Sequence, residues 1–142
     1  GVPGVADPGA AVVAECHRCG IRVVPLVGPS SILLALMASG LNGQSFAFNG
    51  YLPVKPPERS RAIRFFERRA QAEGQSQLFI EAPYRNVKLF EELLRTLAPT
   101  TRLTLAVDVT APGERIITRT VAEWQRQPLP EMNKRPAIFI IG

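Results

Sequence analysis

Histidine and cysteine are scarce in this sequence, and their scarcity removes several classes of catalytic and metal site. The single histidine, His17, lies in a predicted helix between Cys16 and Cys19, which argues against a Ser-His-Asp triad or a histidine general base. The two cysteines form one C-x-x-C motif with no second ligand pair and no thioredoxin-like strand before it. We therefore predict reduced thiols on a helix surface, and no metal site.

Long apolar runs and Gly-rich nucleotide motifs are also missing. The longest apolar run, residues 32–38, is far too short for a membrane span, and no apolar leader precedes a small-residue cleavage site. We therefore expect a cytoplasmic protein. Neither G-x-x-x-x-G-K-[ST] nor G-x-G-x-x-G occurs, so the sequence supports neither a nucleoside triphosphate site nor a dinucleotide-binding fold.

Positive charge is concentrated in the second part of the chain. The net charge of the 142 residues is +5, and residues 1–45 contribute none of it, because two arginines balance two carboxylates there. Between residues 55 and 69, six cations face only Glu58 and Glu67, a local charge of +4. Such a cluster of cations can bind phosphate groups. Alternatively, it is a solvated helix face, since no aromatic residues interleave with the cations. The six cations are Lys55, Arg59, Arg61, Arg64, Arg68 and Arg69.

Apolar periodicity and turn residues predict alternating helices and strands. Before residue 46 we expect helices over residues 10–19 and 32–39, with a buried strand over residues 21–25 between them. After it, the predicted strands are 46–52, 77–81, 102–108, 114–119 and 137–141, and the predicted helices are 57–73, 83–97 and 121–124.

A polar, Gly-containing joint at residues 41–45 coincides with the change in charge and predicts a domain boundary. Residues 1–45 then form the C-terminal part of a parallel α/β domain that contributes to a ligand cleft. Residues 46–142 form a complete mixed-sheet α/β domain, so the fold class is α/β.

Two segments contain residues that could bind a ligand. Residues 28–31, Gly-Pro-Ser-Ser, form a loop between a predicted strand and a helix, where backbone amides can meet a ligand or the loop can simply turn the chain. Glu81 ends an apolar strand, and Arg85 follows four residues later. These two side chains could form a structural ion pair or line a cleft, and both alternatives stay open.

Four segments carry a more specific resemblance. Residues 24–31 are similar to a V-P-x-x-G-P-S/C-A/S pattern, and residues 1–9 to the end of an S-D-A-G-x-P…D-P-G pattern. Residues 48–53 are similar to F-x-G-F-L-P, and residues 79–85 to F-Y-E-S-P-H-R. All four occur in this order in the tetrapyrrole methylase superfamily, and the last two are typical of its ribosomal RNA small-subunit 2′-O-methyltransferase branch. The chain therefore resembles this branch over nearly its whole length.

The resemblance implies an enzyme of two α/β domains with S-adenosylmethionine in the cleft between them. The cofactor arrives activated, so the protein mainly supplies alignment and a dry cleft, and no catalytic residue is assigned. The implied cofactor-binding residues are Pro29, Ser30, Ser31, Ile80, Glu81, Ala82, Pro136 and Ala137. The expected partners are ribosomal RNA and a second copy of the chain. The predicted substrate-binding residues are Arg61, Arg64, Arg68, Tyr84 and Arg85.

Three departures from the family pattern keep alternatives open. The Gly-rich G-x-G-x-G-D opening has no counterpart, so we predict the C-terminal part of a longer enzyme, inactive by itself. The R-E-L-T-K stretch is replaced at residues 106–111 and the K-G-E stretch at residues 133–136. The alternatives are a methylase of a tetrapyrrole or another small molecule, and a non-catalytic RNA-binding or dimerisation module.

Overall fold

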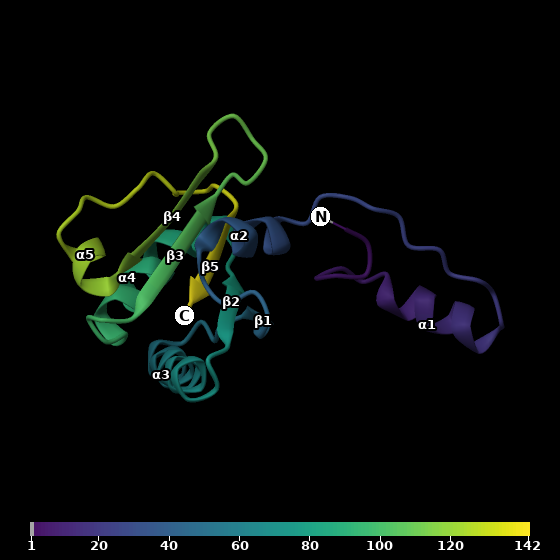
Figure 1. The fold of residues 1–142 in the computed structure, drawn as a ribbon, viewed down its shortest axis with the longest axis horizontal. Coiled ribbons are helices and arrows are strands. Elements are labelled where there is room, and N and C mark those ends of the chain that lie inside the picture. The colour runs from purple at the N-terminus through teal and green to yellow at the C-terminus, as the bar shows by residue number, and fades with distance from the viewer. Residues whose placement is uncertain (1) are drawn as a thin grey trace. The chain divides into compact units, whose positions relative to one another are not determined.

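The computed structural model describes residues 2–142, and the chain divides into two compact units, Gly1–Ser31 and Ile32–Gly142 (Figure 1). The first unit contains helix α1 (Ala10–Arg18), as predicted. Asp7 prepares the turn before this helix, since its carboxylate accepts hydrogen bonds from the amides of Gly4 (3.0 Å) and Gly9 (2.9 Å). These bonds lower the pKa of Asp7 below its ordinary value.

The predicted buried strand at residues 21–25 is wrong. This segment has no regular structure, and the side chains of Ile21 and Val24 are exposed. A strand needs a neighbour to satisfy its backbone groups, and among the described residues of the first unit no strand is present to pair with it. An apolar run alone therefore did not specify a strand here.

A five-stranded mixed sheet forms the centre of the second unit, in the order β1-β2-β5-β3-β4. The first two strands are parallel and are connected through helix α3 (Pro56–Glu73), whereas every other neighbouring pair is antiparallel. The strands are β1 (Phe46–Tyr51), β2 (Ser76–Ile80), β3 (Arg102–Val107), β4 (Arg115–Thr120) and β5 (Ala137–Ile141). All five predicted strands after residue 46 are confirmed.

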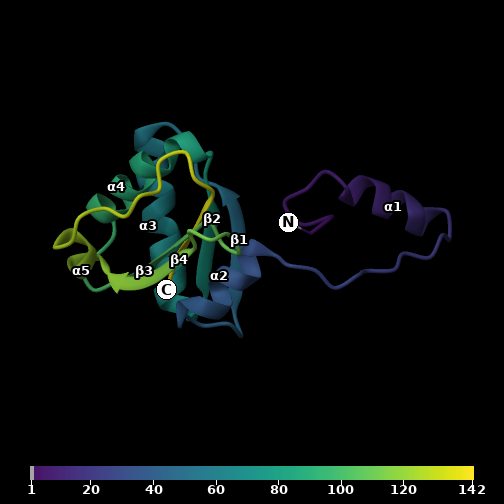
Figure 2. The ribbon, with the colours of Figure 1, turned by 90° about the horizontal axis from the view of Figure 1, so that it is seen from above.

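Helices cover both faces of the sheet (Figure 2). Helix α2 (Ser31–Ser39) packs Ile32, Ala35 and Leu36 on one face, where Leu78 of β2 is buried. The opposite face is covered by α3, by α4 (Asn86–Thr96), which follows a short 3-10 turn at Pro83–Arg85, and by α5 (Val121–Gln125). Successive residues of a strand point to opposite faces, so Phe79 lies in this second core.

The boundary between the compact units lies between Ser31 and Ile32. The reason is that α2 buries its apolar side against the sheet, so the helix expected to close the first part lies on the second. The division of the protein into domains at residues 1–45 and 46–142 stays a prediction.

Helix α3 follows its expected course, except for the orientation of one aromatic ring. The apolar periodicity of this helix predicts that Ile63, Phe65 and Phe66 face the core, and this prediction is wrong for Phe65, because half of this residue (50%) is exposed, whereas Ile63 is fully buried. At about 100° per residue, Phe65 lies about 200° around the helix from Ile63, and Phe66 only about 60° from it. Gly74 ends the helix in the left-handed conformation (φ 61°), as its position predicts.

Two features are absent from residues 2–142. No helix there is long and apolar enough to cross a membrane. Within the same residues, no group of three or more histidine, cysteine or acidic side chains is placed to hold a metal ion.

Candidate functional site at one edge of the sheet

The end of β2 and the start of β5 form one edge of the sheet. Ile80 is the antiparallel partner of Ile138, and Val107, at the end of β3, is the partner of Ala137. The amide of Asp108 donates to the carbonyl of Pro136 (3.0 Å), which extends the pairing beyond β3. The structure thus brings together Ile80, Glu81, Ala82, Pro136 and Ala137, five of the eight residues predicted to bind cofactor.

Loop-to-loop hydrogen bonds hold this edge together. The amide of Lys134 donates to the carbonyl of Pro83 (3.1 Å), and the Asn86 side-chain amide donates to the carbonyl of Arg135 (2.5 Å). Arg135 also forms an ion pair with Asp108 (2.5 Å). Among the described residues, Asn86 Oδ1 is a buried acceptor without a hydrogen-bond partner.

Backbone strain is concentrated at the same edge. Asp108 (φ 51°), Thr110 (φ 73°) and Lys134 (φ 58°) all lie in the left-handed region. This conformation is costly for a β-branched residue such as Thr110, whose amide is held by Glu114 Oε1 (2.8 Å). Strained residues gather at ligand sites more often than elsewhere, so this edge is the candidate binding edge.

Glu81 is the centre of a buried charge network. Its carboxylate forms ion pairs with Arg59 (3.2 Å) and Arg85 (3.1 Å), and it accepts from the amide of Ala82 (2.7 Å). The hydrogen bond to Glu81 raises the pKa of Arg85 above its ordinary value. The ion-pair alternative for Glu81 and Arg85 is therefore realised, and the Glu81 side chain is fully engaged within the protein.

Arg59 is the site residue that the sequence analysis missed. It had been counted with the exposed cations, but only 4% of it is exposed. Its guanidinium donates to the Pro53 carbonyl (2.8 Å) and also contacts Glu92 (3.4 Å), which accepts from the Ser60 hydroxyl (3.0 Å). The sequence did indicate that Arg59 is buried, because Arg59 lies four residues before the buried Ile63 and therefore on the same face of the helix.

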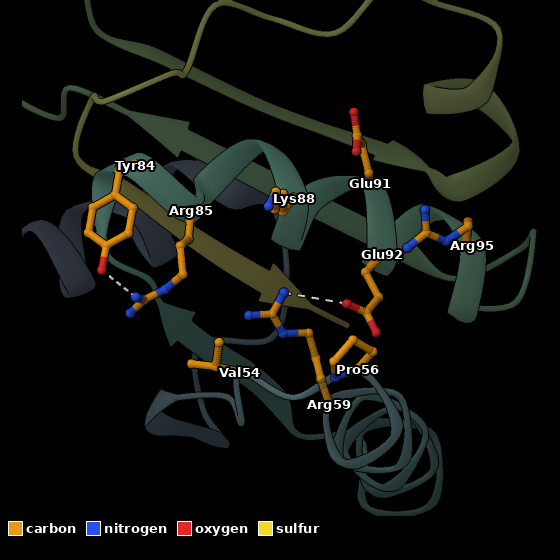
Figure 3. Close-up of a pocket in the computed structure, with 9 residues that line it drawn as sticks. All are labelled: Val54, Pro56, Arg59, Tyr84, Arg85, Lys88, Glu91, Glu92 and Arg95. Atoms are coloured by element: carbon orange, nitrogen blue, oxygen red, sulfur yellow. Dashed lines mark hydrogen bonds and ion pairs between the residues drawn. The ribbon is translucent and has the colours of Figure 1, made fainter.

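A pocket of ≈ 610 Å³ opens beside this network, between the start of α3 and the exposed side of α4 (Figure 3). At one end, the Arg85 guanidinium lies 4.7 Å from the ring centroid of Tyr84 and donates to its hydroxyl. The structure thus places both of these predicted substrate residues in one pocket. The lining residues are Val54, Pro56, Arg59, Tyr84, Arg85, Lys88, Glu91, Glu92 and Arg95.

The other three predicted substrate residues lie on the exposed side of α3. Arg61, Arg64 and Arg68 are all exposed, and Arg61 donates to the carbonyl of Pro57 (3.2 Å). By helical spacing, Phe65 lies on the same side as these arginines. The view that no aromatic residue interleaves with the cations is therefore wrong, since an exposed ring lies among them.

The predicted cofactor loop belongs to the first compact unit. Pro29 and Ser30 lie in the irregular segment before α2, and Ser31 is the first residue of that helix. The contribution of these three residues to a cofactor site stays a prediction.

No family model matches the chain, but curated relatives do. Ribosomal RNA small subunit methyltransferase I from Vibrio cholerae is 34% identical over 123 residues, 87% of this chain and 41% of that protein. The protein of the same name from Escherichia coli O157:H7 is 32% identical over 141 residues, 99% of this chain and 48% of that protein. The chain thus spans about half the length of the curated relatives it matches.

Solved structures confirm the α/β fold class of the tetrapyrrole methylase type. The methyltransferase CobJ superposes with a TM-score of 0.62 at 22% identity, covering 100% of this chain and 61% of that one. Uroporphyrin-III C-methyl transferase from Thermus thermophilus, solved with S-adenyl homocysteine, gives a TM-score of 0.50 at 24% identity, with 100% and 62% covered.

Proposed function

Because this chain has the tetrapyrrole methylase fold and is related in sequence to ribosomal RNA small subunit methyltransferase I, we propose that its protein methylates ribosomal RNA with S-adenosylmethionine. The observation that carries the proposal is the sequence relation over 99% of the chain. A cytoplasmic location and a homodimer stay predictions.

The sheet edge supports a cofactor site. The backbone of Ile80–Ala82 and of Pro136–Ala137 would meet the adenosine end, and the loop at Pro29–Ser31 would complete the site. One feature of the edge fits adenine, whose amino group is a hydrogen-bond donor, because the buried acceptor Asn86 Oδ1 lacks a partner among the described residues. The Glu81 side chain is not expected to bind cofactor directly, since its oxygens serve Arg59 and Arg85.

S-adenosylmethionine supplies an activated sulfonium methyl, so the residues of this chain need only bind, orient and exclude water. The Glu81 network would keep the end of β2 rigid while Arg61, Arg64, Arg68 and Tyr84 hold the polyanion. Exposed arginines around Phe65 support RNA over a tetrapyrrole, because a single-stranded nucleic acid binds through both phosphate charge and ring stacking.

Calorimetry and methyl transfer in the full-length protein test the proposal. We expect S-adenosylmethionine and its demethylated product to bind, and labelled methyl to reach small-subunit ribosomal RNA. Ala82→Leu should weaken cofactor binding by adding bulk at the edge, whereas the matched Ala122→Leu on α5 should not. Transfer to uroporphyrinogen III but not to RNA would favour the tetrapyrrole alternative, and absence of cofactor binding would contradict both enzymes.

A further inference from the structure

The pocket beside the Glu81 network is lined by a row of charged residues from one side of α4 and the turn before it. Arg85, Lys88, Glu92 and Arg95 follow one another at spacings of three, four and three, which places them along one stripe of the helix. Arg59 of α3 faces this stripe and contacts Glu92. The lining therefore holds four cations and only two carboxylates, Glu91 and Glu92.

Three of these six charges are already paired, and Lys88, Arg95 and Glu91 are not. Arg59 and Arg85 share Glu81, and Glu92 is held by Arg59 and the Ser60 hydroxyl. Lys88, Arg95 and Glu91 form no ion pair and no side-chain hydrogen bond with any described residue. Figure 3 shows Glu91 pointing to the opposite side of α4 from Arg59. The paired charges fix the floor of the pocket, and the two free cations, Lys88 and Arg95, against the single free carboxylate of Glu91 leave it positive.

Tyr84 adds an aromatic wall at the other end. One side of its ring is covered by the Arg85 guanidinium, yet 65% of the residue is exposed. An unstacked base could therefore lie on the uncovered side. Val54 and Pro56 close the pocket from the α3 side.

We propose that this pocket is an RNA subsite that holds one phosphodiester of a single-stranded segment between Lys88 and Arg95, with the neighbouring base on Tyr84. The inference rests on the proposed RNA methyltransferase function and adds Lys88 and Arg95 to its substrate contacts. A volume of ≈ 610 Å³ is large enough for one nucleotide. The subsite adjoins the edge where Glu81 ends β2, so it holds RNA beside the proposed methyl donor.

The test compares two double variants of the full-length protein that lose the same charge. Lys88→Gln/Arg95→Gln removes the free cations of the pocket. Arg102→Gln/Arg126→Gln is the matched control, because Arg102 begins β3 at the end of the strand away from Val107, and both side chains are exposed. Affinity for a labelled single-stranded oligoribonucleotide is measured by fluorescence anisotropy across a salt series. Binding of inorganic phosphate is measured by calorimetry.

We expect Lys88→Gln/Arg95→Gln to weaken oligoribonucleotide binding roughly tenfold at low salt and to reduce the salt slope by about 0.7 units, because one phosphodiester contact is lost. The control variant should keep both the affinity and the salt slope within twofold of the values of the unmodified protein. Equal losses in the two variants would overturn the subsite, because the effect would then come from net charge. Weakened binding of inorganic phosphate with unchanged oligoribonucleotide binding would also overturn it, and would assign the pocket to a small anion.

The failure of this inference can be told from failure of the proposed function. If the Arg61, Arg64 and Arg68 substitutions weaken RNA binding and those of Lys88 and Arg95 do not, only the subsite is wrong. If the unmodified protein binds no RNA, the proposed function fails and the subsite with it. Normal unfolding of the double variant by urea shows that any loss is local.

Discussion

Arginine residues lie on both sides of helix α3, and their environments on the two sides are opposite. On the inner side, Arg59 is buried and its guanidinium is bound by Glu81, Glu92 and the Pro53 carbonyl. On the outer side, Arg61, Arg64 and Arg68 are exposed and contact no carboxylate of the described chain. Only one residue separates Arg59 from Arg61, yet Arg59 belongs to the interior and Arg61 can bind a ligand.

The comparison shows why a count of charges along the chain is a poor guide to a binding surface. The local +4 of residues 55–69 includes Arg59, whose charge is balanced by Glu81, directly after β2, and by Glu92 of α4. Arg69 is likewise engaged, with Glu73 (3.4 Å). The cationic surface available to a polyanion is therefore smaller than the sequence suggests, and helical position decides which arginines form it.

The largest expected effect is a loss of stability when the ion pairs of Arg59 on the inner side of α3 are removed. Arg59→Met should destabilise the protein by about 3–5 kcal/mol, because it leaves Glu81 and Glu92 buried without their main cation. Urea unfolding followed by circular dichroism measures this. The matched change on the outer side, Arg61→Met, should stay within about 0.5 kcal/mol. Similar losses in the two variants would show that the inner network contributes no special stability.

Substitutions on the outer side of α3 are expected to weaken RNA binding without a loss of stability. Replacing Arg61, Arg64 and Arg68 together with glutamine should weaken binding of small-subunit ribosomal RNA and lower the salt slope by about 2 units, since each phosphate contact to a single strand contributes about 0.7. Anisotropy titrations across a salt series measure both values. Unchanged affinity and slope in a folded variant would remove this side of α3 from the RNA site and favour the small-molecule substrate.

The smallest expected effect comes from Phe65, the aromatic residue on the outer side of α3. Phe65→Leu should weaken binding of single-stranded RNA about fivefold, the lower end of what one stacked base contributes, because the ring is only half exposed. The salt slope should not change, as no charge is lost. Phe65→Tyr keeps the ring and should bind as well as the unmodified protein. If leucine and tyrosine behave alike, Phe65 makes no stacking contact.

Several features followed from local pattern alone. The five strands after residue 46 and the helices between them were predicted within a few residues, because apolar periodicity, prolines and Gly74 act over short stretches of chain. The motif resemblance named the family of proteins to which the curated relatives belong. It also selected Ile80–Ala82 and Pro136–Ala137, 54 or more residues apart, which the sheet then brought to one edge.

The sequence by itself therefore determined most of the elements and the relation to the curated relatives, whereas the tertiary structure decided which side chains can meet a ligand. The strand expected at residues 21–25 did not form, because pairing needs a neighbour that no local pattern supplies. Phe65 became exposed and Arg59 buried because packing of α3 on the sheet set its inner side, and the carboxylates that stabilise Arg59 lie directly after β2 and in α4, 22 and 33 residues away. Burial and long-range pairing depend on contacts across the fold, and these exist only once the chain has closed around its core.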